Sequence, residues 1–327
     1  MAVNLTTVLA GVEFANPVFA ASGCAAAGQE LDAFTDVTSL GGVVTKSVMR
    51  APRAGRPTPR MAETASGMLN SIGLQGPGID AFLATDLPWL LERGARPVVS
   101  IAGTSVQEYA ELAQVLRAVP GVALIEVNIS CPNVEDRGHV FACNPASAAA
   151  VVAAVRRNSR VPVFAKLSPD VTDIVEIADA VVRAGADGLS LINTLLGLAI
   201  DPGSLRPVLG AVTGGLSGPA IKPVALRCVW QVHAAFPQVP IFGIGGIRTG
   251  VDVLEFLLAG ASAVQVGTAL FGDPTALPRI IGELETVLDE RGFGCVGEVV
   301  GRAHRSPLSV APEGPDPLGD ASLRATG

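Results

Sequence analysis

One short stretch of the sequence, Asn-Ile-Ser-Cys-Pro-Asn from Asn128 to Asn133, combines residue types that could do chemistry on a small molecule. It follows an apolar run from Val122 to Ile129 that is typical of a buried strand. Cys131 can transfer a proton or act as a nucleophile, and the two carboxamides can both donate and accept hydrogen bonds without carrying charge. A buried thiol beside two turn-forming asparagines is the commoner situation. The rest of the chain decides between the two interpretations.

The chain contains only three lysines, Lys46, Lys166 and Lys222, and the first two stand at the ends of apparent strands. Lys166 interrupts an otherwise apolar run, where a lysine is rarely buried without a partner. It could form a Schiff base or donate a hydrogen bond to an electron-rich atom of a cofactor, and Lys46 presents the same choice. A lysine that only extends its ammonium group to solvent is the alternative.

Glycines gather at two further strand ends, in Gly243–Gly246 and at Gly267 before Thr268. Backbone N–H groups without a neighbouring side chain let a phosphate approach closely, and α/β barrels commonly bind phosphate after their seventh and eighth strands. The same glycines could merely permit tight turns. No G-x-G-x-x-G motif opens a strand–helix unit, so a Rossmann-type site is not indicated. Together with Gly218, the pattern favours a phosphorylated cofactor.

Short aliphatic segments alternate with helical patterns and predict the elements that position these groups. The strands lack apolar–polar alternation, as expected of parallel strands covered on both faces. Eight are expected, at residues 17–20, 42–45, 97–101, 124–129, 162–167, 188–192, 241–244 and 263–266. Helices are expected at residues 106–118, 145–157, 171–183, 219–235 and 251–259, with a capping box at Ser105 and Glu108 and a cap at Thr249.

Polar residues or glycines occur at the end of every expected strand. In an α/β barrel all of these ends face one side, so the distribution predicts a single (β/α)₈ TIM barrel. A doubly wound open sheet is the alternative. The residues concerned are Ser22, Lys46, Ser100, Asn128, Lys166, Asn193, Gly245, Gly246, Gly267 and Thr268.

Other segments are expected to extend the barrel. Residues 3–14 predict a short N-terminal hairpin, and the barrel domain is expected to span residues 1–305. The tail at 306–327 is rich in Pro, Gly and Asp and is expected to be disordered. Connections longer than packing requires, which are candidates for lids or partner-binding surfaces on the active face, occur at residues 47–79, 131–144 and 194–217.

Composition excludes several classes of function. The net charge is −7 and no basic cluster occurs, so nucleic acid is not an expected partner. Five cysteines with no C-x-x-C pair supply neither a disulfide framework nor a zinc or iron–sulfur ligand set, so no metal is expected and a reducing cytoplasm fits best. No apolar run reaches the roughly 18 residues that a membrane-spanning helix needs.

Several motifs together resemble the class 1 dihydroorotate dehydrogenases, from about residue 3 to residue 300. The cysteine of the Asn-x-Ser-Cys-Pro-Asn motif separates this class from the membrane-attached class, which has serine there. The motifs at 67–70 and 213–218 resemble those of the NAD-linked branch, class 1B. The stretches that carry the resemblance are Ser22–Cys24, Thr45–Ser47, Gly67–Gln75, Asn128–Asn133, Lys166–Pro169, Ile192–Thr194 and Thr213–Ala220.

The resemblance implies an FMN-dependent oxidation of dihydroorotate to orotate in pyrimidine biosynthesis. Cys131 would be the base that removes a proton from C5 while hydride leaves C6 for the flavin, with Lys46 between substrate and flavin. A free thiol has a pKa of about 8.5, which makes it a usable base near neutral pH. Lys166 would stabilise the negative charge that develops on the reduced flavin.

The resemblance also assigns binding residues. Ser100 departs from the family, which usually has asparagine there, so its contact with the flavin is in doubt. Expected substrate-binding residues are Lys46, Asn70, Ser71, Ile72, Gly73, Leu74, Asn128, Asn133, Asn193 and Thr194. Expected FMN-binding residues are Ser22, Lys46, Ser47, Ser100, Asn128, Lys166, Ile192, Gly218, Gly245, Gly246, Gly267 and Thr268.

The NAD-linked branch implies a homodimeric core with a partner subunit that carries FAD and an iron–sulfur cluster. A fumarate-using homodimer or a related dihydropyrimidine dehydrogenase is the nearest alternative. A Schiff-base aldolase that uses Lys166 and a non-catalytic flavin- or phosphate-binding module are alternatives of other classes.

Overall fold

The structure is a computed structural model that describes residues 3–129 and 141–305. Eight strands close into a barrel in the order β10-β15-β16-β3-β4-β7-β8-β9, and every neighbouring pair is parallel. The predicted (β/α)₈ barrel is therefore confirmed, and the open doubly wound sheet is wrong. The strands are β3 Val18–Ala20, β4 Gly42–Val44, β7 Pro97–Ile101, β8 Leu124–Asn128, β9 Val163–Leu167, β10 Gly188–Leu191, β15 Ile241–Ile244 and β16 Ala263–Val266.

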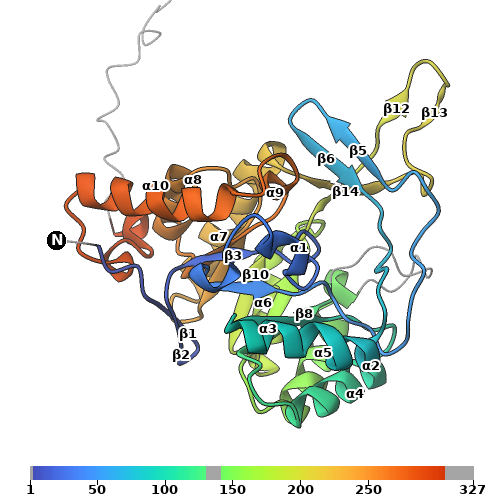
Figure 1. Ribbon diagram of the computed structural model, residues 1–327, viewed down its shortest axis with the longest axis horizontal. Helices are drawn as coiled ribbons and strands as arrows, with labels where there is room; N and C mark the ends of the chain where they lie inside the picture. Colours follow the sequence, from blue (N-terminus) through green and yellow to red (C-terminus); the bar gives the residue numbers. More distant parts are fainter. Residues whose placement is uncertain (1–2, 130–140, 306–327) are drawn as a thin grey trace, which may run out of the picture.

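Helices surround the barrel on its outside (Figure 1). Among the described residues, none of them is both long and apolar enough to cross a membrane. The longer helices are α3 Leu87–Arg93, α4 Val106–Arg117, α5 Pro145–Asn158, α6 Ile174–Arg183, α7 Lys222–Ala235, α8 Gly250–Leu258 and α10 Ala276–Glu290. Short helices are α1 Gln29–Asp32, α2 Ile79–Ala81 and α9 Ala269–Gly272, and the 3₁₀ turns include η4 Pro219–Ile221 and η6 Arg302–His304.

Helix ends differ from the predictions where a side chain competes for the backbone. The helix expected from residue 171 begins at Ile174, because the Asp173 carboxylate accepts a hydrogen bond from Val175 N and caps it there. The helix expected from residue 219 is a 3₁₀ turn followed by α7. Ser105 caps α4, but the Glu108 carboxylate accepts from Thr104 N instead of closing a capping box.

The inward-facing residues of the barrel form layers. At the amino-terminal ends of the strands, Phe19, Phe164 and Phe242 are completely buried. The Phe242 ring lies 4.9 Å from Phe19 and 5.3 Å from Phe164 between centroids. The predicted hairpin, β1 Thr7–Leu9 and β2 Val12–Phe14, covers this end and adds the Phe14 ring 5.0 Å from Phe19. This end of the barrel is therefore a packed apolar plug.

Two of the long connections on the opposite face fold together. The strands β5 Met61–Thr64, β6 Gly67–Asn70, β14 Gly214–Ser217 and β11 Leu195–Gly197 form one antiparallel sheet in the order β11-β14-β6-β5. A hairpin of β12 Ile200–Asp201 and β13 Arg206–Pro207 projects away from the barrel beside it (Figure 1). The sequence predicted these segments as long loops and gave no sign that they pair. Most of the remaining long connection, residues 131–144, lies outside the described residues.

Candidate active site

A cavity of about 760 Å³ opens at the carboxyl-terminal ends of the barrel strands, under the β5–β6–β14–β11 sheet. Its walls combine side chains from barrel strand ends with residues of that sheet. Of the predicted site residues, those that line it are Ser22, Lys46, Ser47, Asn70, Ile72, Gly73, Leu74, Asn128, Lys166, Ile192, Asn193, Thr194, Gly218, Gly245, Gly246, Gly267 and Thr268.

Four predicted residues are not placed in this wall. Cys131 and Asn133 lie outside the described residues. Ser71 is completely buried beside the cavity and its backbone N–H donates to Arg60 O, so only its neighbours face the cavity. Ser100 is also completely buried and does not line the cavity, because its short side chain ends at Ser47, with which it shares a hydrogen bond of 2.9 Å.

A chain of hydrogen bonds fixes the carboxamides on one side of the cavity. Asn193 Nδ2 donates to Asn128 Oδ1 at 3.3 Å, and Asn128 Nδ2 donates to Ser47 Oγ at 2.9 Å. Tyr109 on α4 donates its hydroxyl to the Asn128 carbonyl oxygen at 2.7 Å and fixes the strand end from behind. Side chains fixed in this way present donors and acceptors in set directions, which suits a ligand with N–H and C=O groups on its edge.

Asn70 reaches the same cavity from the sheet above the barrel. It ends β6, where it pairs with Gly215 of β14, and its Nδ2 donates to Gly215 O at 3.4 Å. A Cβ at Gly215 would collide with Thr194, so glycine is required for the sheet to approach the barrel this closely. The paired loops therefore bring a third carboxamide over the barrel end.

The two lysines of the cavity come from β9 and from the end of β4, which are separated by β7 and β8 in the barrel. Lys46 follows β4, and its backbone N–H donates to Ala26 O at 2.8 Å. Lys166 lies in β9, is 6% exposed, and pairs with Glu126 of β8, with 3.5 Å between Nζ and Oε1. Glu126 balances the charge of Lys166, but both ammonium groups remain hydrogen-bond donors that would favour an electron-rich ligand.

Cys24 is a second thiol in the cavity wall that the sequence analysis did not assign. Burial raises its pKa to about 11, against the lowering effect of the Lys166 and Lys46 charges. The Cys24 thiol is therefore protonated at neutral pH and is a poor base or nucleophile there.

The glycine-rich loops after β15 and β16 form the other side of the cavity. Gly246 has a φ of +72°, and a Cβ there would lie 2.9 Å from Gly218 O. Only glycine lets the loop after β15 approach the segment after β14 this closely while its backbone N–H groups stay accessible. Thr268 donates its hydroxyl to Ser217 Oγ at 2.8 Å and joins the barrel loop to β14.

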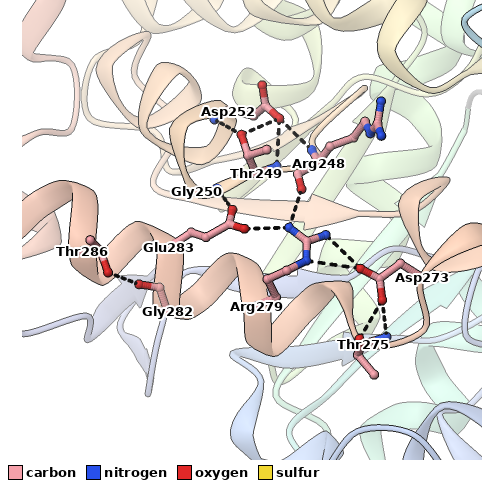
Figure 2. A network of polar contacts seen from close by, with 10 residues as sticks. All are labelled: Arg248, Thr249, Gly250, Asp252, Asp273, Thr275, Arg279, Gly282, Glu283 and Thr286. Atoms are coloured by element: carbon pink, nitrogen blue, oxygen red, sulfur yellow. Dashed lines mark hydrogen bonds and ion pairs between the residues drawn. The ribbon is translucent and has the colours of Figure 1, made fainter.

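A network of charged residues holds both loops from outside (Figure 2). Arg279 on α10 donates to Asp273 at 2.9 Å, to Glu283 at 2.8 Å and to the Arg248 carbonyl at 3.3 Å. The Asp252 carboxylate accepts from the backbone N–H groups of Arg248 and Thr249. The network ties the loop after β15 to the loop after β16 and fixes the spacing of the glycines.

Sequence reasoning missed this network and two buried polar residues beneath the cavity, Glu126 and Gln265. Glu126 interrupts the apolar run from Val122 to Ile129. The signal that could have identified it is the period of two along a strand, which places Glu126 on the same face as Asn128. Gln265 likewise stands two residues before Gly267.

These features suit a polar, electron-rich ligand that carries a phosphate. Carboxamides and ammonium groups lie toward one side and accessible glycine backbone toward the other, and the volume falls in the 300–1,000 Å³ range of cofactor sites. The residues present therefore fit a flavin mononucleotide together with a small polar substrate.

The fold and the cavity define an α/β-barrel enzyme whose small-molecule site lies at the carboxyl-terminal ends of the strands. More particularly, the chain belongs to the dihydroorotate dehydrogenase family, whose model matches residues 4–288. This confirms the family resemblance drawn from the motifs, and membership makes the chain an oxidoreductase and implies a flavin cofactor.

Similar proteins of known name point to one branch of the family. The chain is 54% identical over 298 residues to a protein of Pelobacter propionicus, covering 91% of this chain and 98% of that one. It is 52% identical over 298 residues to a protein of Geobacter sulfurreducens, covering 91% and 97%. It is 49% identical over 303 residues to a protein of Geobacillus kaustophilus, covering 93% and 96%. Each is named dihydroorotate dehydrogenase B (NAD(+)), catalytic subunit.

Proposed function

We propose that the chain oxidises dihydroorotate to orotate with FMN as the immediate electron acceptor, and that the electrons pass to NAD⁺ through a partner subunit. The observation that carries the proposal is the combination of carboxamides, two lysines and glycine loops around one cavity, in a chain about half identical to proteins named as B-type catalytic subunits. The reaction removes a proton from C5 and a hydride from C6, and a C5=C6 double bond forms between them.

The residues of the cavity divide into two groups by the chemistry they offer. Asn70, Asn128, Asn193 and Asn133 would bind the amide edges and carboxylate of dihydroorotate, because neutral carboxamides match alternating N–H and C=O groups without charge repulsion. Thr194 and the backbone of residues 71–74 would complete that side. The cavity lining supports this division, since Asn70, Asn128 and Asn193 meet there from three different elements.

The FMN site would be formed by the rest of the cavity. Gly218, Gly245, Gly246, Gly267 and Thr268 would hold the phosphate with backbone N–H groups. Ser22, Ser47, Ile192, Lys46, Asn128 and Lys166 would surround the ring, with Ser100 acting only through Ser47. When bound, FMN accepts the hydride that leaves C6.

The proton is removed by the chain itself. Cys131 would take the C5 proton as a thiolate, and it stands three residues after Asn128 in the sequence. Cys24 is not an alternative base, because burial raises the pKa of its thiol to about 11. Lys46 would lie between substrate and flavin, and Lys166 would stabilise the negative charge of the reduced ring.

The test is the absorbance spectrum of the purified chain before and after dihydroorotate is added without oxygen. We expect a yellow protein whose flavin band bleaches stoichiometrically. A colourless protein, or a flavin that does not bleach, would refute the proposal. A borohydride-trapped adduct on Lys166 would support a Schiff-base aldolase instead.

The electron acceptor is tested separately. The chain alone should not reduce NAD⁺, and adding a co-purifying subunit with FAD and an iron–sulfur cluster should restore that reduction. Direct oxidation of dihydroorotate by fumarate would place the chain in the fumarate-using branch. We expect the complex in the cytoplasm, because the cysteine pattern suits a reducing compartment.

We also expect the chain to form a homodimer. Large apolar side chains are exposed on the segment that projects from the barrel, with Leu205 82% and Ile200 61% exposed, and a second copy would cover them. Sedimentation should give twice the monomer mass for the chain alone, and Leu205→Asp should shift it toward the monomer.

A further inference from the structure

Three polar side chains form a cluster directly beneath the cavity. Glu126, Gln265 and Lys166 are 0%, 1% and 6% exposed and come from β8, β16 and β9. Gln265 Nε2 donates to Glu126 Oε2 at 2.7 Å, and Glu126 Oε1 lies 3.5 Å from Lys166 Nζ. Lys166 and Gln265 line the cavity, whereas Glu126 does not.

The cluster occupies the layer between the apolar plug and the cavity. Residues two positions earlier on the same strands, Leu124, Phe164 and Ala263, belong to the plug. Because side chains alternate along a strand, Glu126, Lys166 and Gln265 point into the barrel above them. A carboxylate in this layer has no access to bulk water, so its position there requires partners.

Glu126 is held by Gln265 and faces the Lys166 ammonium group. Gln265 binds one carboxylate oxygen and leaves the other toward Lys166. A lysine has a flexible four-carbon stem, so the carboxylate limits where its ammonium group lies. The separation of 3.5 Å is longer than the roughly 2.7–2.9 Å of a close charge-assisted hydrogen bond, which leaves the ammonium donors accessible to a ligand in the cavity.

Buried polar atoms without hydrogen bonds mark the same layer. Of the six buried side-chain atoms without a hydrogen-bond partner among the described residues, three lie here: Glu126 Oε1, Gln265 Oε1 and Ser190 Oγ. Two of these atoms are pure acceptors, and Ser190 pairs with Lys166 across β10 and β9. The Lys166 ammonium group, which has three hydrogen-bond donors, therefore lies in a layer that contains several buried acceptor atoms.

We propose that Glu126, fixed by Gln265, is a positioning residue that places the Lys166 ammonium group and balances its charge. The proposal rests on the proposed function, in which the flavin ring lies against Lys166. With the carboxylate present, the pair carries no net charge, so reduction of the ring to an anion is favoured less than it would be by an unpaired lysine. The pair therefore sets the reduction potential of the bound flavin while it holds Lys166 in reach.

The experiment measures the midpoint potential of the bound flavin by equilibration with a reference dye, which needs no substrate. In Glu126→Gln the ammonium loses its counter-charge, so the potential should rise. In Lys166→Met the cation is lost, so the potential should fall. The double variant lacks both charges, and its potential should return toward that of the unaltered chain.

A kinetic measurement separates positioning from substrate binding. In Glu126→Gln, kcat for flavin reduction should fall roughly 10-fold with KM for dihydroorotate nearly unchanged, since the carboxamides are untouched. Arg183→Met is the control, because Arg183 pairs with Asp179 on the exposed face of α6 and takes no part in the cavity or its loops. Its potential and kcat should equal those of the unaltered chain.

The outcomes distinguish the two levels of the proposal. An unaltered chain that binds no flavin, or whose flavin dihydroorotate does not bleach, defeats the proposed function. A bleachable flavin whose potential is the same with and without Glu126 defeats the positioning role alone. If Glu126→Gln does not fold, the double variant should still lie above Lys166→Met in potential, and equal potentials would overturn the inference.

Discussion

The two ends of the barrel are built from the same eight strands but differ in how completely their side chains are packed. At the amino-terminal end, Phe19, Phe164 and Phe242 are completely buried and contact one another edge to face or at a tilt. At the carboxyl-terminal end, buried atoms of Glu126 and Gln265 have no hydrogen-bond partner among the described residues. The amino-terminal end is filled by its own apolar side chains, whereas the carboxyl-terminal end carries buried polar groups beneath an open cavity.

This difference between the two ends of the barrel indicates which substitutions should change stability and which should change activity. Apolar contacts in a filled core contribute to stability in proportion to the area and volume they fill. Polar groups oriented toward a cavity contribute little to stability and are retained for binding. Substitutions at the two ends should therefore affect different measurements.

Cys131→Ala should have the largest effect, and only on activity. Without a general base, flavin reduction by dihydroorotate should slow by roughly 10²–10⁴, while flavin content and the urea midpoint stay unchanged. Stopped-flow absorbance measures the rate. Cys24→Ala is the control, since a thiol with a pKa of about 11 is not the base; a comparable loss of rate in that variant would reverse the assignment.

Phe242→Ala should show the opposite pattern. Removing a buried ring from the plug should cost about 3–5 kcal/mol of unfolding free energy through lost contacts and a cavity. The folded fraction should keep its kcat, because Phe242 lies beneath the cluster and does not line the cavity. Urea denaturation and single-turnover rates check both parts. Loss of activity with stability retained would break the comparison between the two ends.

Thr249→Ala should have a smaller effect that touches both measurements. Thr249 and Asp252 form the capping box of α8, and the same Asp252 carboxylate fixes the backbone of Arg248 beside the glycine loop. Loss of the cap should cost about 1 kcal/mol of stability and slightly weaken FMN binding. Thr249→Ser, which keeps the hydroxyl, should restore both. An FMN affinity unchanged in Thr249→Ala would separate the cap from the site.

The smallest expected effect is a pH dependence of the unfolding free energy that arises from His233 on α7. Burial lowers the pKa of His233 on α7 from its ordinary value of 6.5, and the neighbouring His304 and Arg305 lower it further. The unfolded chain then binds more protons than the folded chain below about pH 6.5. Stability should therefore be unaffected above pH 7 and fall as the pH drops through 6.5 toward the folded-state pKa.

The check is the urea midpoint of the chain and of His233→Asn between pH 8 and pH 5. The decline below pH 7 should be shallower in the variant, and activity measured at pH 8 should be equal in both. An equally steep decline in the variant would assign the pH dependence to other groups.

Much of the fold followed from local patterns. Each barrel strand was predicted within one or two residues, as at 97–101 for β7 and 241–244 for β15. Of the polar residues and glycines at the ends of these strands, all but Ser100 line the cavity, including Asn193 and Gly246. Helix starts were less accurate, because a single cap such as Asp173 decides them.

Contacts between distant segments could not be predicted in this way. The antiparallel sheet joins residues near 67–70 to residues near 214–217, and neither segment carries a signal for its partner. The same holds for Ser100, whose polar position marked it for the cavity although it reaches the cavity only through Ser47. Whether a side chain reaches the cavity depends on the residues packed around it, and these cannot be identified from the sequence alone.

The sequence by itself determined the strand pattern, the polar strand ends and therefore the barrel and the face that carries the site, because periodicity and turn residues act over a few neighbouring positions. Only the tertiary structure decided that Glu126 and Gln265, 139 residues apart, meet beneath Lys166. Barrel closure creates that contact, since it brings strands from distant parts of the chain around one axis.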